Sequence, residues 1–321
     1  FAMFRYAFAF LCVLSIALAA CGSQPKSPSP TAPSTIEAAS PLRALATTTL
    51  VGDVVRQVGG DAIRLDVLLP VASDPHSFEP TPQDVLKLAS TDVLFINGAG
   101  LETFLDRLIS SADSQAKVVD ASQGIQLLAS QEAHEHEGEE HDEEHPAGDP
   151  HVWMDPNNVL IWVDNIERSL SELDAANAAT YHANAQRYRQ ELQQLDAWIR
   201  QQVAQIPPAN RKLVTDHLVF TYFAEEYGFT QVGAVIPGYS TLAEPSAQDL
   251  AALEDAIREL GVKAVFVGST VNPALAQRVA QDTGVRLVFI YTGSLSQPGG
   301  EAATYLDFMR YNVRAIVEAL R

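Results

Sequence analysis

Three histidines lie at places in the sequence where metal chemistry is possible. His76 lies in the segment Ser73–Pro80, His151 lies in the segment Asp149–Pro156, and His217 follows further along the chain. A neutral imidazole nitrogen binds a borderline cation such as Zn²⁺ at about 2.0–2.1 Å. Each of them could alone be an ordinary loop histidine, but three at equivalent places favour one shared ligand set. The sequence therefore predicts one tight Zn²⁺ site.

A second group of histidines lies in an acidic segment, residues 131–149. This group comprises His134, His136, His141 and His145, interspersed with nine carboxylates from Glu132 to Asp149. The segment lacks the periodicity of a helix or strand, and one interpretation is a solvated acidic loop. Histidine-rich tracts also bind transition metals, and carboxylates raise the local cation concentration. We expect a flexible, weak auxiliary metal loop beside the main site.

The elements that must position the three histidines follow a repeated pattern. Apolar runs typical of buried strands occur at 65–70, 92–97, 117–120, 212–215, 230–236, 263–268 and 286–291. Helical patterns lie between them, at 49–58, 82–89, 101–110, 219–227, 247–260, 273–283 and 304–320. Such alternation indicates parallel sheets covered by helices on both faces. The predicted fold class is α/β with two Rossmann-like lobes, and His76 and His217 follow strand ends, where ligands bind in such sheets.

One long helix is expected between the lobes. Residues 174–205 contain no Gly or Pro, and apolar side chains recur there at three- and four-residue intervals. A helix over most of this segment would be roughly 40 Å long. One interpretation is an ordinary helix within one lobe. Its place between an N-terminal lobe at 43–173 and a C-terminal lobe at 206–321 instead favours a connecting helix, with the metal site between the lobes and little opening at a hinge.

The first 42 residues are typical of an export signal and a tether. Residues 1–20 hold one basic residue followed by a long apolar run, which predicts a lipoprotein signal peptide. Leu18-Ala19-Ala20-Cys21 resembles a bacterial lipobox, in which Cys21 is lipidated, although a plain signal peptide with an incidental cysteine is the alternative. Residues 21–42 are rich in Ser and Pro, as in a tether. We therefore expect an extracytoplasmic protein attached to a membrane by an acyl anchor.

Composition excludes several functions. The chain has 321 residues, with 40 acidic side chains against 21 basic ones and a formal net charge of −19. So acidic a surface repels phosphate backbones, which argues against nucleic-acid binding. The two cysteines, Cys12 and Cys21, both precede the body of the protein, so a cysteine-based zinc cage there is excluded.

The sequence resembles a known family over nearly all of Arg43–Arg321. The motifs that carry the resemblance are Asp74-Pro75-His76 with Glu79-Pro80-Thr81-Pro82, the segment Asp149–Pro156, and His217 with Phe220, Tyr222-Phe223 and Tyr227-Gly228. They are similar to motifs of the metal-binding receptors of bacterial ABC importers, above all the ZnuA-like zinc receptors. The resemblance implies two α/β lobes joined by a long helix. It also implies metal ligation by His76, His151 and His217, a membrane permease as partner, and a monomer.

One position departs from the family pattern. Many relatives place an aspartate ligand after the last strand, whereas Gly293 occupies that place within Tyr291–Leu295. The fourth ligand is then water or, transiently, a histidine of the acidic loop. Loss of an oxygen ligand favours Zn²⁺ over Mn²⁺, because Mn²⁺ prefers more oxygen.

These observations favour a zinc receptor without enzymatic activity. A manganese or other divalent-metal receptor of the same family, and a surface adhesin, are the alternatives. A zinc hydrolase is a further alternative, since three histidines and a water also form catalytic sites. It would need a general base, for which Asp216 and Glu244 are candidates only by default, since a role in supporting a ligand or capping a helix suits both better.

Overall fold

The computed structural model describes residues 40–129 and 148–321. The predicted signal peptide, Cys21, nearly all of the tether and the histidines His134, His136, His141 and His145 lie outside the described residues. Within the described part of the chain, no helix is long and apolar enough to cross a membrane.

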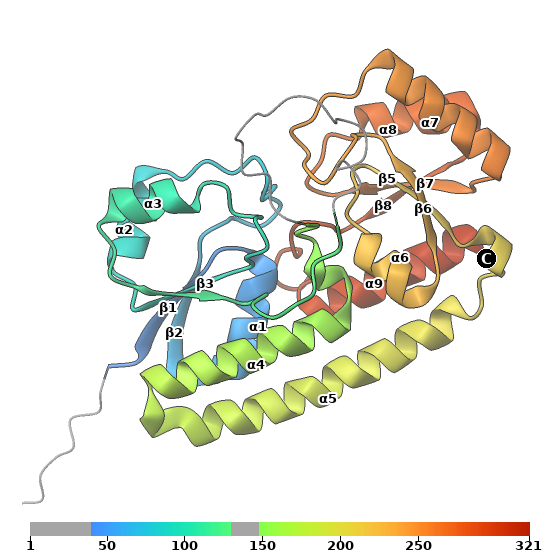
Figure 1. The fold of residues 1–321 in the computed structure, drawn as a ribbon. Coiled ribbons are helices and arrows are strands. Elements are labelled where there is room, and N and C mark those ends of the chain that lie inside the picture. Colours follow the sequence, from blue (N-terminus) through green and yellow to red (C-terminus); the bar gives the residue numbers. More distant parts are fainter. Residues whose placement is uncertain (1–39, 130–147) are drawn as a thin grey trace, which may run out of the picture. The chain divides into compact units, whose positions relative to one another are not determined.

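The first lobe is built on a four-stranded parallel sheet (Figure 1). Its strands, in spatial order, are β2 (Ile63–Val67), β1 (Leu42–Ala46), β3 (Val93–Ile96) and β4 (Lys117–Asp120). Strand β1 was missed by the sequence analysis and begins at Leu42, a residue that the predicted tether included. Its sequence is short and interrupted by Arg43, which pairs with Asp92, so it lacks a continuous apolar run.

Helices cover both faces of this sheet, as the apolar strands predict. One face, which includes Ala46 and Phe95, packs against α1 (Thr49–Gly59) and α4 (Pro156–Leu173). The other face, which includes Leu45, packs with residues of α2 (Pro82–Ala89) and α3 (Leu105–Ala112).

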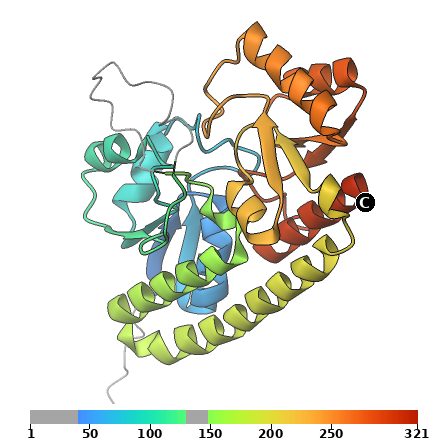
Figure 2. The ribbon, with the colours of Figure 1, turned by 45° about the vertical axis from the view of Figure 1, so that its right-hand side comes forward.

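The second lobe repeats this architecture. Its parallel strands, in spatial order, are β6 (Thr230–Ala234), β5 (Lys212–Thr215), β7 (Ala264–Gly268) and β8 (Arg286–Ile290). Helices α6 (Thr221–Tyr227) and α9 (Tyr305–Leu320) contribute to the core on one face. Helices α7 (Ala247–Leu260) and α8 (Ala274–Thr283) cover the other, as both views show (Figures 1 and 2).

A single long helix, α5, runs along both lobes (Figures 1 and 2). It spans Ala178–Val203, 26 residues, which at 1.5 Å per residue is about 39 Å. It contacts α1 and α4 in the first lobe and α9 in the second. The side chains of its buried stripe are Tyr181, Ala185, Tyr188, Leu192, Leu195, Ile199 and Val203. The predicted α/β fold with two sheets and a long helix is confirmed.

Two predicted elements are displaced for identifiable reasons. The strand expected at 65–70 lies at 63–67. The apolar run continues past the end of the strand, because Leu68 and Leu69 are buried in the loop that follows it. The helix expected at 101–110 begins only at Leu105. The side chain of Glu102 instead turns back and accepts hydrogen bonds from the backbone of Asn97 and Gly98.

Candidate metal centre

The structure brings His76, His151 and His217 together. His76 lies in the loop after β2, His151 directly precedes a short 3-10 turn before α4, and His217 follows β5. One nitrogen from each ring lies within 4.8 Å of the others. The Nε2 atom of His151 is 3.0 Å from that of His76 and 3.3 Å from that of His217.

These separations suit a shared metal ion. Two nitrogens at zinc-ligand distance from one tetrahedral ion lie about 3.3–3.4 Å apart. Among residues 40–129 and 148–321, no carboxylate or thiol joins this group. The arrangement therefore offers three imidazole nitrogens to one ion.

Buried carboxylates orient two of the three rings. Asp149 Oδ1 accepts hydrogen bonds from the backbone N–H of His151, at 2.9 Å, and from its Nδ1, at 2.7 Å. Asp216 Oδ1 accepts a 2.7 Å hydrogen bond from Nδ1 of His217. A proton on Nδ1 leaves the Nε2 lone pair free, and such carboxylate partners raise the basicity of a metal-binding histidine.

The surroundings of His76 and His151 favour the neutral imidazole, which is the form that binds metal. Burial, followed by the charges of His151 and His217, holds the pKa of His76 well below 6.5. Burial also lowers the pKa of His151, although the charge of Asp149 opposes this. His151 and His217 are almost completely buried, whereas His76 is partly exposed.

Residues of both lobes meet around the site. The indole Nε1 of Trp153 donates to the carbonyl of Thr292 at 3.0 Å, and its ring centroid lies 5.2 Å from that of His151. The hydroxyl of Tyr305 donates to the carbonyl of Trp153 at 2.7 Å. Trp153 therefore packs between the lobes and covers one side of His151.

Gly293 lines the same small cavity as the three histidines, together with Thr270. A Cβ added to Gly293 would lie 2.7 Å from Pro75 Cδ and 3.6 Å from Thr270 Oγ1. Gly293, which replaces the aspartate of the family pattern, therefore faces the site without a side-chain ligand atom, and Pro75 packs against it.

Asp74 and Asp149 support the histidines that follow them, and the sequence carries a signal for this role. Asp-Pro-His occurs twice, at 74–76 and 149–151. In both copies the aspartate accepts a hydrogen bond from the backbone N–H of the histidine. Both carboxylate oxygens of Asp216 already accept hydrogen bonds, Oδ2 from the backbone N–H of Gly268 and Oδ1 from Nδ1 of His217, so this side chain supports a histidine ring. Glu244 lies on an exposed loop.

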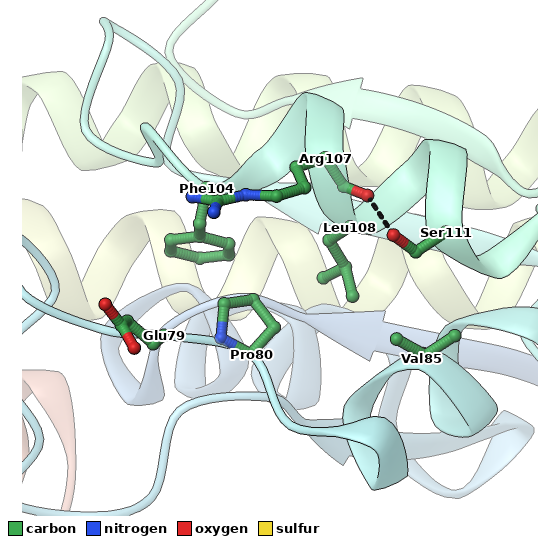
Figure 3. A pocket seen from close by; sticks show the side chains of 7 residues that line it. All are labelled: Glu79, Pro80, Val85, Phe104, Arg107, Leu108 and Ser111. Atoms are coloured by element: carbon green, nitrogen blue, oxygen red, sulfur yellow. Dashed lines mark hydrogen bonds between the residues drawn. The ribbon is translucent and has the colours of Figure 1, made fainter.

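A separate cavity of about 180 Å³ lies in the first lobe (Figure 3). Its lining consists of Glu79, Pro80, Val85, Phe104, Arg107, Leu108 and Ser111. The lining combines apolar side chains with the charged Glu79 and Arg107, and it contains no imidazole. It does not provide the ligand set that a transition metal requires.

Comparison with known proteins identifies similar chains over nearly the full length. The family described as ZnuA, the periplasmic component A of zinc-uptake complexes, matches residues 45–319. The manganese-binding lipoprotein MntA of Halalkalibacterium halodurans is 33% identical, and the match covers 99% of each chain. The iron-binding protein YfeA of Yersinia pestis is 31% identical, over 88% of this chain and 87% of that one. The periplasmic zinc-binding protein TroA from Treponema pallidum superimposes with a TM-score of 0.79 and 27% identity, over 88% of this chain and 99% of that one.

Proposed function

The chain belongs to the ZnuA family of metal-binding receptors of ABC importers, and we propose that it captures Zn²⁺ outside the cytoplasm and delivers it to a membrane permease. The family is a family of substrate-binding receptors, not of enzymes. The metal is the cargo, and capture and release involve no covalent chemistry.

The observation that carries the choice of zinc is the all-imidazole ligand set. His76, His151 and His217 present nitrogen atoms at spacings suited to one ion. Gly293 has no side chain, so it supplies no side-chain oxygen at the place where the family pattern has an aspartate. Imidazole ligands suit Zn²⁺, whereas Mn²⁺ prefers carboxylate, carbonyl and water oxygens.

Manganese is the second candidate, because the full-length relative MntA is named as manganese-binding and is 33% identical. A manganese receptor with this site would have to take most of its oxygen ligands from water. We therefore expect Zn²⁺ to bind more tightly than Mn²⁺.

The acidic segment and the anchor complete the proposal. Leu128 and Asp149, which flank residues 130–147, are joined by a backbone hydrogen bond of 2.9 Å. Both ends of the histidine-rich segment therefore leave the first lobe close to His151, which suits a role in collecting metal weakly beside the main site. We further propose that Cys21 carries the lipid and that the receptor is a monomer.

The test is a competition between Zn²⁺ and Mn²⁺ for the purified protein, measured by calorimetry and by metal analysis. We expect one tight Zn²⁺ site that is lost in His151→Ala and retained in His182→Ala. His182 is an exposed histidine on the connecting helix α5, where it pairs with Glu167 of α4. Tighter binding of Mn²⁺ would refute the choice of zinc. Retention of the tight site in His151→Ala would refute the ligand assignment.

A further inference from the structure

Within the segment Gly238–Leu242 of the second lobe, Gly238, Tyr239 and Thr241 each make a contact close to one of the three histidines. We call this segment the strap; it lies between β6 and α7. It follows an outer strand of the second sheet, and His76 follows an outer strand of the first. The strap is therefore placed to join the two lobes at the site.

The first contact fixes the strap beside His217. The carbonyl of Gly238 accepts a 2.9 Å hydrogen bond from the backbone N–H of Leu218, the residue after His217. Gly238 has a φ of +90°, which side chains other than glycine rarely adopt, so the sequence permits this turn.

The second contact lies beside His151. The ring of Tyr239 has its centroid 6.3 Å from that of His151. Its hydroxyl donates to the carbonyl of Ala129, at 3.3 Å, in the first lobe.

The third contact reaches the loop that carries His76. The hydroxyl of Thr241 donates a 2.5 Å hydrogen bond to Oδ2 of Asp74. Asp74 in turn accepts from the backbone N–H of His76, at 3.1 Å, and from the hydroxyl of Ser77, at 3.1 Å. A hydrogen bond to a carboxylate is stronger than a neutral one, so Thr241 holds the loop through Asp74.

His76 needs this support more than the other two histidines. His151 and His217 are buried and each donates Nδ1 to its own carboxylate. His76 is partly exposed, and among the described residues Nδ1 of His76 has no hydrogen-bond partner. Its position therefore depends on the backbone of its loop.

We propose that Thr241 is a positioning residue that acts through Asp74 to hold His76 on the metal ion, and thereby sets the rate of metal release. This inference rests on the proposed capture of metal by the three histidines. When the hydrogen bond between Thr241 and Asp74 breaks, the loop after β2 can carry His76 away, which leaves the ion with two protein ligands.

The experiment compares Thr241→Val, which keeps the shape of the side chain and removes the hydroxyl, with Thr241→Ser, which keeps the hydroxyl. Thr283→Val is the matched control, because that hydroxyl donates to the carbonyl of Val279 on a helix remote from the histidines. The rate of zinc release is measured by stopped-flow mixing of the zinc-loaded protein with an excess of a fluorescent chelator. Hydrogen exchange of residues 72–79 is measured on the metal-free protein.

We expect Thr241→Val to release zinc about ten-fold faster, as for loss of one hydrogen bond to a charged group, and to exchange faster at 72–79. Thr241→Ser and Thr283→Val should match the unaltered protein in both measurements. An unchanged release rate in Thr241→Val, or equally fast release from Thr241→Ser, overturns the inference while the proposed function stands. Failure of the unaltered protein to bind zinc overturns the proposed function and this inference with it.

Discussion

Substitution of Asp149 by asparagine would separate the contribution of a buried charge from that of its hydrogen bonds. The side chain is completely buried, and Oδ1 accepts from both the backbone N–H and Nδ1 of His151. An asparagine of nearly the same shape can present its oxygen to the same two donors. The substitution therefore removes the negative charge and preserves the geometry.

The expected magnitude follows from the role of that charge. A neutral amide polarises the imidazole less than a carboxylate does, so Nε2 becomes a weaker ligand. Loss of such a partner typically lowers metal affinity about 10–100-fold, which corresponds to about 1.4–2.7 kcal/mol. We expect Asp149→Asn to bind zinc more weakly than the unaltered protein by a factor in this range.

Stability of the metal-free protein should respond differently. Oδ2 of Asp149 is buried without a hydrogen-bond partner among the described residues, so the charge is incompletely solvated in the fold. A neutral amide removes this desolvation cost but buries an amide group instead. We expect the free energy of unfolding without metal to change by less than about 1 kcal/mol.

The assay combines calorimetric competition of zinc against a chelator with thermal unfolding of the metal-free protein. Asp61→Asn is the control, because it removes one negative charge at an exposed position in the first lobe. Asp61→Asn should leave both quantities unchanged. Unaltered zinc affinity in Asp149→Asn would refute the claim that this carboxylate tunes His151.

Three other changes test separate parts of the structure. Burial raises the pKa of Glu102 to about 7 from 4.5, so the folded state keeps a proton that the unfolded state loses. The free energy of unfolding should therefore fall, by at most about 3 kcal/mol, as the pH rises from about 4.5 to 7. Urea titrations of Glu102→Gln should show a smaller fall. Gly268→Ala would place a Cβ 2.1 Å from Thr292 Oγ1 and 2.9 Å from Asp216 Oδ2. The resulting displacement of Asp216 from His217 should weaken zinc affinity, measured by calorimetry, about ten-fold or more. Unaltered affinity would contradict this. Deletion of residues 132–147 should reduce zinc uptake only under zinc starvation, and unchanged uptake there would indicate a mere spacer.

The sequence predicted elements best where local signals mark their ends. Helix α2 begins at Pro82, as expected. The carboxylate of Asp84 accepts a hydrogen bond from the backbone N–H of Thr81, and proline, which has no backbone N–H, suits the first turn, where that group would have no partner in the helix. Strand β1 was missed because it has few consecutive apolar residues, and only its central place in the sheet buries it. Burial of that kind depends on neighbours that a local pattern does not reveal.

The same distinction between local signals and distant contacts applies to the candidate metal centre. That the three histidines lie close together was predictable, because their motifs follow strand ends or precede a helix. The partnership of Asp149 with His151 was within reach, since the two residues are neighbours in the repeated Asp-Pro-His motif. The contact between Thr241 and Asp74 was not, because it joins residues 167 positions apart in different lobes.

The way the lobes are joined limits how metal can leave. One apolar cluster runs from α1 and α4 through α5 to α9, so it includes residues of both lobes. Wide separation of the lobes would expose this cluster to water, at about 25 cal/mol for each Å² of apolar surface. Movement of the loop that carries His76 exposes far less apolar surface and breaks the hydrogen bond between Thr241 and Asp74. We therefore expect release to begin with His76, while His151 and His217 stay fixed by their carboxylates.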